Sequence, residues 1–73
     1  MKEEFEIRTM GFGELAQMYN PTIGKGSASN TLRKWILLNK DLHNALKQTG
    51  YKKYIKVLTP KQVQLIVEAL GEP

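Results

Sequence analysis

The residues whose types could do chemistry gather in residues 23–35, the stretch IGKGSASNTLRKW. A lysine between glycines, followed by hydroxyl side chains, suggests either a loop that cradles phosphates or the start of a nucleic-acid-reading helix. A phosphate loop of the nucleotide enzymes needs a glycine, four residues and then Gly-Lys-Ser or Gly-Lys-Thr, after a strand. Here Gly26 follows Gly24-Lys25, and the position five residues before Gly24 is Tyr19. The pattern therefore argues against a nucleotide site.

Residues able to catalyse or to bind a metal are not grouped in the sequence. The single histidine, His43, has no partners at a ligand spacing, whereas a metal site usually needs three or four ligands. The carboxylates lie near the N-terminus or are scattered, so no pair is placed for general acid–base catalysis. The absence of cysteine removes disulfides and thiolate metal sites. We therefore expect no enzymatic activity, no small-molecule substrate, no metal and no cofactor.

Positive charge is concentrated in the middle of the chain. The net charge of the 73 residues is +4, but residues 27–61 hold eight basic side chains against one acid, Asp41. The flanking segments, 1–26 and 62–73, are net acidic. Segregated positive charge is the electrostatic footprint of a polyanion binder. The alternative is that the lysines only keep a small protein soluble.

The composition favours a single globular domain, 1–73. Hydrophobic residues make up 41% of the sequence and charged residues 25%, which is typical of a folded soluble chain. The N-terminus shows no signal peptide, and no apolar run approaches the ~20 residues that span a bilayer. We therefore expect a cytoplasmic protein without a membrane partner.

The sequence predicts a mostly α fold with a small β-sheet (α+β), about four short helices plus a strand and a basic wing. Phe5–Ile7 alternates as a short strand does, and Lys56–Leu58 is its expected partner. Helical spacing places a first helix over residues 12–19, which Asn20-Pro21 ends. Ile23 is the one expected core anchor of the loop that follows.

Local signals define the next two helices. Ser27 is the expected cap of the second helix, because its hydroxyl can accept from a free backbone N–H. One stripe of that helix is apolar and should face the core: Ala28, Leu32, Trp35 and Ile36. The opposite side carries Asn30, Thr31, Arg33, Lys34 and Leu37. Asn39 is the expected cap of a third helix, which Gly50 stops in a left-handed turn.

The basic segment and the last helix follow. Tyr51–Leu58 is aromatic, β-branched and basic, which predicts an extended segment or a hairpin. Thr59 is the expected cap of the last helix, with Pro60 in the first turn and Gln62 reaching back in a capping box. The buried stripe of that helix is predicted to be Val63, Ile66, Val67 and Leu70.

The arrangement predicts a nucleic-acid interface made by a helix-turn-helix and a basic wing. Outward polar side chains of the second helix can bond base edges and phosphates, and its first turn can hold a phosphate oxygen. The candidate residues are Lys25, Ser27, Ser29, Asn30, Thr31, Arg33, Lys34, Tyr51, Lys52, Lys53, Tyr54 and Lys56. The alternatives are a merely solvated helix face and tyrosines that pack against the sheet.

Several motifs resemble a known family. They are Glu14-Leu15-Ala16, Thr31-Leu32-Arg33-Lys34-Trp35, Gly50-Tyr51-Lys52-Lys53-Tyr54, and Leu58-Thr59-Pro60-Lys61-Gln62-Val63 with Ile66. Together they are similar to the winged-helix DNA-binding half of mercury-resistance-regulator (MerR) and excisionase proteins. That resemblance implies DNA contacts at Thr31, Arg33 and Lys34 and, in the wing, at Tyr51, Lys52 and Tyr54. The turn over residues 20–26 is longer than in that family, and Lys52 replaces an arginine and its bidentate fork.

The whole sequence more closely resembles an uncharacterised family of short bacterial proteins, through Thr59-Pro60-Lys61-Gln62-Val63 and the ending Leu70-Gly71-Glu72-Pro73. That family implies a fold and no activity. We expect a small protein that binds double-stranded DNA, a transcriptional or mobile-element accessory factor. The alternative is a protein–protein interaction adaptor that docks through the region of Leu37 and Leu38. RNA binding is a third option, although the aromatic platform it commonly uses is not evident.

Overall fold

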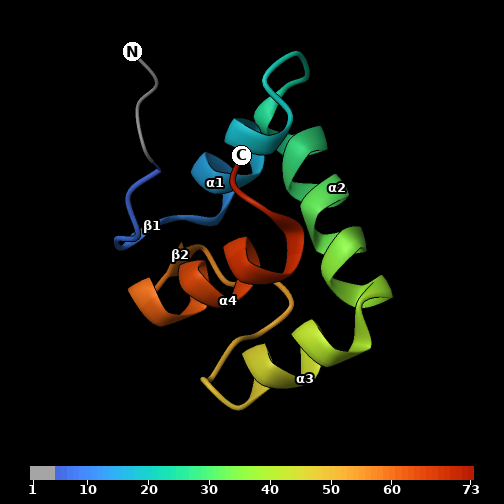
Figure 1. Ribbon diagram of the computed structural model, residues 1–73. Helices are drawn as coiled ribbons and strands as arrows, with labels where there is room; N and C mark the ends of the chain where they lie inside the picture. Colours follow the sequence, from blue (N-terminus) through green and yellow to red (C-terminus); the bar gives the residue numbers. More distant parts are fainter. Residues whose placement is uncertain (1–4) are drawn as a thin grey trace.

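The computed structural model describes residues 5–73, which form four helices and one two-stranded antiparallel sheet around a shared core. In chain order the elements are β1 (Met10–Gly11), α1 (Phe12–Tyr19), α2 (Lys25–Leu38), α3 (Lys40–Lys47), β2 (Val57–Leu58) and α4 (Pro60–Leu70). Helix α2 runs along one side of the molecule, from α1 at its start to α3 at its end (Figure 1). The predicted α+β class and element order are confirmed.

Helix α1 occupies the predicted range, residues 12–19. Asn20 ends the helix, because its φ of −133° and ψ of 68° are not helical and Pro21 follows it. Its N–H still donates to the carbonyls of Ala16 and Gln17 at 3.1 and 3.2 Å. The Asn20 side chain also donates to the Ala16 carbonyl, at 3.2 Å. The chain then turns over residues 20–24 and enters α2, which packs against α1.

Helix α2 begins two residues before the predicted cap. Gly24 occupies the cap position in an extended conformation, with φ −64° and ψ 159°, so Ser27 lies inside the helix and the predicted cap is wrong. The sequence favoured Ser27 as the cap over Gly24 because a glycine has no side-chain oxygen to accept from a free backbone N–H. Ile23 is 39% exposed, so the predicted core anchor is also wrong. Its carbonyl instead accepts a hydrogen bond from Gln17 Nε2 at 3.0 Å.

The apolar stripe of α2 faces the core as predicted. Ala28, Leu32 and Ile36 are fully buried, and Trp35 packs partly buried against the core. The Trp35 ring meets Tyr19 of α1 edge to face, with 6.1 Å between ring centroids and 87° between planes. Such an aromatic pair adds to the stability gained from burial alone, and here it joins the outer flanks of α1 and α2.

The predicted caps of α3 and α4 are confirmed. Asn39 Oδ1 accepts from the Leu42 N–H at 3.1 Å. Gly50 has φ +88°, a left-handed conformation that side chains with a Cβ rarely adopt. At the start of α4 the Thr59 hydroxyl accepts from the Gln62 N–H at 3.2 Å, while Gln62 Oε1 accepts from the Thr59 N–H at 2.9 Å.

Gln62 also connects two helices. Its side chain is buried, at 1% exposure, and its Nε2 donates to the Thr49 hydroxyl at 2.9 Å. That hydroxyl in turn donates to the Leu46 carbonyl at 2.6 Å. Because buried polar groups need partners, Gln62 fixes the first turn of α4 against the end of α3.

The sheet uses an N-terminal strand different from the predicted one. Met10 pairs with Leu58 and Gly11 with Val57. The C-terminal strand therefore lies within the predicted Lys56–Leu58, but Phe5–Ile7 forms no strand and that prediction is wrong. With only two pairs, alternation cannot fix a register. Burial does, since Met10 and Leu58 are 3% and 0% exposed and lie in the core.

Candidate nucleic-acid interface

Arg33 joins α2 to the basic segment, by which we mean residues 51–56. Its Nε donates to the Lys53 carbonyl at 2.9 Å and its Nη1 to Asn30 Oδ1 at 2.8 Å. Its guanidinium carbon lies 5.1 Å from the ring centroids of both Phe12 and Tyr54. Two hydrogen bonds and two aromatic contacts fix the side chain. Arg33 is thus a bridge within the protein rather than a freely projecting side chain.

The basic segment is held to the rest of the protein at three backbone positions. At its start the Tyr51 N–H donates to the Leu46 carbonyl at 3.2 Å, and at its end the Lys56 carbonyl accepts from the Phe12 N–H at 2.9 Å. Arg33 holds the middle. The segment contains a turn at residues 53–54 and no strand. The extended segment or hairpin predicted over Tyr51–Leu58 is therefore wrong for residues 51–56, and only Val57–Leu58 is a strand. Its lysines are nevertheless displayed from a fixed backbone.

A groove lies where α1, α2 and the basic segment meet, and we call it the Arg33 groove. Its lining residues are Phe12, Gly13, Lys25, Ser29, Arg33, Tyr54, Ile55 and Lys56. Three of these side chains are cationic and none is acidic. They come from the first turn of α2, from the middle of α2 and from the basic segment, which are far apart in the sequence.

Gly13 permits the close contact between α1 and the start of α2. A Cβ at this position would lie 2.9 Å from Lys25 Cγ and 3.3 Å from Ser29 Oγ, closer than packed atoms ordinarily approach. The aliphatic part of Lys25 therefore lies directly over α1. This contact places the Lys25 side chain at the groove.

The carboxylate of Glu14 in α1 pairs with Arg8 and not with a cation of the Arg33 groove. Glu14 accepts from Arg8 Nη2 at 3.0 Å and from the Gly11 N–H at 3.3 Å. The hydrogen bond from Arg8, followed by that from Gly11, lowers the pKa of the Glu14 carboxyl, and the charge of Lys25 adds a smaller effect. Within residues 5–73, Lys25 forms no ion pair.

The outward side of α2 carries the polar residues that the sequence predicted there. Ser27, Asn30 and Lys34 are exposed. Thr31 is half-buried, and its hydroxyl donates to the Ser27 carbonyl at 3.0 Å. That hydroxyl is therefore partly engaged within the helix, while Lys34 projects into solvent.

The two tyrosines of the basic segment have different environments. Tyr51 is only 7% exposed and its ring lies 6.5 Å from that of Phe12. Burial raises the pKa of the Tyr51 hydroxyl, against the opposing charge of Arg33. Tyr54 is 69% exposed, with Arg33 and the Lys53 ammonium over its ring. Tyr51 is thus a packing residue, and Tyr54 belongs to the surface.

The structure therefore divides the predicted residues into groups. Those that surround or contact Arg33 are Lys25, Ser29, Asn30, Lys53, Tyr54 and Lys56. Lys52 is exposed and belongs to the same basic segment. The outward side of α2 carries Ser27, Thr31 and Lys34, whereas Tyr51 lies in the core. The sequence did not predict that Phe12 and Gly13 would line the groove. A phenylalanine and a glycine at the start of a helix do not indicate that an arginine from another helix will lie beside them.

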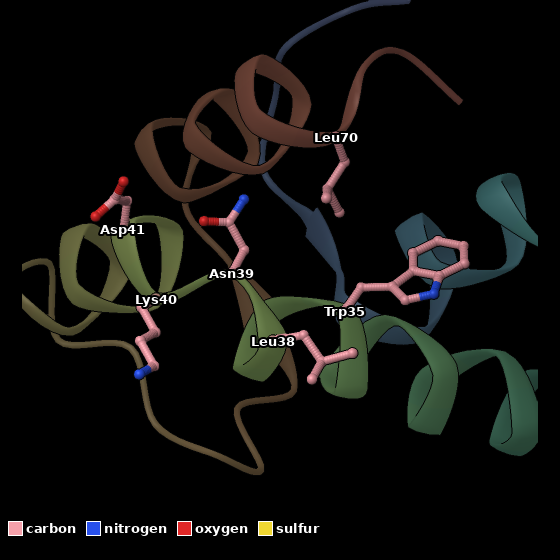
Figure 2. A pocket seen from close by; sticks show the side chains of 6 residues that line it. All are labelled: Trp35, Leu38, Asn39, Lys40, Asp41 and Leu70. Atoms are coloured by element: carbon pink, nitrogen blue, oxygen red, sulfur yellow. The ribbon is translucent and has the colours of Figure 1, made fainter.

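A second hollow lies at the other end of α2. It is lined by Trp35, Leu38, Asn39, Lys40, Asp41 and Leu70 (Figure 2). Figure 2 shows Lys40 and Asp41 projecting to opposite sides of the chain. Leu37 and Leu38 beside it are 50% and 72% exposed, as the sequence predicted.

Residues 5–73 hold no group of three or more histidine, cysteine or acidic side chains placed to bind a metal ion. No helix in that part of the chain is long and apolar enough to cross a membrane.

One family of known sequences matches the chain. The family model for a domain of unknown function, DUF4248, matches residues 6–73. No curated protein and no solved structure matches the chain. The predicted resemblance to an uncharacterised family is thus supported, whereas no match supports the resemblance to MerR and excisionase proteins, which stays a prediction.

Proposed function

We propose that this chain, which belongs to the DUF4248 domain family, is a small protein that binds double-stranded DNA through α2 and the basic segment. In this proposal α1 and α2 act as a helix-turn-helix and the basic segment takes the place of a wing. The protein would be a transcriptional or mobile-element accessory factor and not an enzyme.

One contact supports the proposal above all others: the hydrogen bond from Arg33 to the Lys53 carbonyl. It keeps the lysines of the basic segment next to α2, although the two are separated by twenty residues. Cations from two parts of the chain are then available to one polyanion. A surface of this kind can neutralise several phosphates at once, which supplies a large share of the affinity for DNA.

The dimensions of α2 suit the proposed role. Its 14 residues correspond to a length of about 21 Å, and an α-helix fits the major groove of B-DNA. Asn30 and Lys34 are exposed on the side of α2 away from its buried stripe. An amide and an ammonium can bond base edges or phosphates there, while the basic segment meets the neighbouring backbone.

The test is duplex binding by fluorescence anisotropy over a series of salt concentrations. Counterion release predicts a log–log slope of about −0.9 for each phosphate contact. Lys34→Glu should weaken binding strongly. Lys61→Glu is the matched control, because Lys61 is exposed in the first turn of α4 and the charge change is the same. Figure 1 shows that α4 begins on the side of the molecule away from α2. No binding at low salt, or equal affinity of the two variants, would contradict the proposal.

A second candidate function is that of a protein-binding adaptor. Its support is the exposure of Leu37 and Leu38 beside the hollow that Trp35 and Leu70 help to line. Contiguous exposed apolar side chains often mark a protein interface. A partner that stays bound after nuclease treatment, and that Leu38→Asp but not Lys34→Glu releases, would favour the adaptor.

A further inference from the structure

We propose that the Arg33 groove is a preformed site for one phosphate group, bound by Lys25, Ser29, Arg33 and Lys56. This inference deepens the proposed function and rests on it in one respect, namely that the phosphate is taken to belong to the backbone of a duplex. It assigns Arg33 to phosphate binding and not to base recognition.

Charge is the first reason. Lys25, Arg33 and Lys56 line the groove, and no acidic side chain does. The nearby carboxylate of Glu14 already accepts two hydrogen bonds, from Arg8 and from the Gly11 N–H. Three cations around one hollow repel one another, and an anion between them offsets that repulsion. The groove therefore favours an anionic ligand.

Hydrogen-bonding capacity is the second reason. Two nitrogen atoms of the Arg33 guanidinium are engaged within the protein, while its Nη2 donates no hydrogen bond to any of residues 5–73. The Ser29 hydroxyl and the ammonium groups of Lys25 and Lys56 likewise have no hydrogen-bond partner in that part of the chain. Several donors thus remain for one ligand, and charge-assisted bonds to phosphate oxygens are the strong ones.

Fixed geometry is the third reason. The Arg33 side chain is held between Phe12 and Tyr54, and the carbonyls of Lys53 and Lys56 are both bonded to other elements. The donors therefore lose little backbone freedom when a ligand binds, which favours affinity. A phosphate group carries several oxygens around one centre, so it can accept hydrogen bonds from several of these side chains at once. A carboxylate carries only two oxygens.

The test is a titration of the ¹⁵N-labelled protein with inorganic phosphate, followed by NMR and compared with sodium chloride at the same ionic strength. We expect saturable shifts of the Arg33 Nε–H signal and of the backbone N–H signals of Gly13, Ser29 and Lys56. Lys25→Gln and Lys56→Gln should each weaken phosphate binding roughly tenfold, as expected for one charge-assisted contact. Lys61→Gln, outside the groove, should leave it unchanged.

Duplex binding by the same variants separates the two proposals. Weaker duplex binding in Lys25→Gln and Lys56→Gln, together with the phosphate shifts, supports both. Phosphate shifts without any duplex binding support the site, with free phosphate as its ligand, and contradict the proposed function. Absence of saturable phosphate shifts overturns the site, and the proposed function then stands only if the duplex is still bound. A duplex affinity that neither glutamine substitution changes also overturns the site, because the groove then holds no phosphate of the duplex.

Discussion

Arg33 Nε and the Lys53 carbonyl oxygen lie 2.9 Å apart and join residues twenty positions apart in the sequence. The bond uses the backbone of Lys53 and not its ammonium, which lies 5.3 Å from the centroid of the Tyr54 ring. The guanidinium carbon also lies 5.1 Å from the ring centroid of Tyr54, the next residue along. One side chain of α2 therefore holds the middle of the basic segment, while the Tyr51 N–H and the Lys56 carbonyl hold its two ends.

Arg33→Lys should disturb the basic segment although the net charge is unchanged. A lysine has no planar fork, so it cannot bond the Lys53 carbonyl and Asn30 while stacking between two rings. We expect faster amide hydrogen exchange in residues 52–55 and weaker duplex binding. The control is Lys34→Arg, which also conserves charge at an exposed position. Exchange rates and affinity equal to those of the unchanged protein would show that Arg33 acts by charge alone.

Two glycine-to-alanine substitutions in helices should differ in effect. Alanine normally stabilises a helix interior by about 0.5–1 kcal/mol relative to glycine. Gly26 is the second residue of α2 and a Cβ there meets nothing within 4 Å, so Gly26→Ala should give part of that gain. At Gly13 the Cβ would lie 2.9 Å from Lys25 Cγ, so the gain should be smaller and phosphate binding weaker. Thermal unfolding and phosphate titration of the two variants measure this, and equal stabilisation with unchanged binding would contradict it.

Gln62→Ala should destabilise the fold by about 1–3 kcal/mol, the cost of leaving buried hydrogen-bonding groups without partners. The substitution removes the acceptor of the Thr59 N–H and the donor to the Thr49 hydroxyl. Gln64→Ala, on the exposed side of the same helix, should change stability by less than about 0.5 kcal/mol. Urea unfolding of both variants measures the difference. Similar midpoints for the two would show that the buried link contributes little.

Stability should fall at high pH because of Tyr19. Burial, and then the nearby charge of Glu72, raises the pKa of the Tyr19 hydroxyl from 10.0 to about 12. The unfolded chain therefore loses this proton at lower pH than the folded protein does. The stabilisation is complete below pH 10 and is lost between about pH 10 and 12. In Tyr19→Phe that part of the pH dependence should disappear, as measured by urea unfolding at several pH values. An unchanged pH dependence would contradict the assignment.

The elements that the sequence predicted correctly are those that local chemistry determines. Thr59 and Gln62 lie three residues apart, and Gly50 has to supply a left-handed backbone wherever the rest of the chain goes. The range of α1 follows from helical spacing and the proline that comes after it. In each case the residues from which the structure was predicted are the same residues that form it.

The features that the sequence could not predict depend on contacts between distant residues. Helix α2 begins at Lys25 where its side chain packs over Gly13, and the sheet forms where Met10 is buried. The sequence around these residues contains no pattern that indicates either contact. The polar side of α2 was predicted, but the engagement of Arg33 with the basic segment was not, because helical spacing shows only that a side chain leaves the core.

The three hydrogen bonds that hold the backbone of the basic segment have a consequence for the rate of binding. A cationic loop that is already ordered needs no folding step after it meets a polyanion, so encounter and productive association coincide. The association rate constant should then follow long-range attraction and fall steeply with ionic strength. Releasing the middle hydrogen bond, that of Arg33, would instead add a slow, salt-insensitive phase to the binding traces.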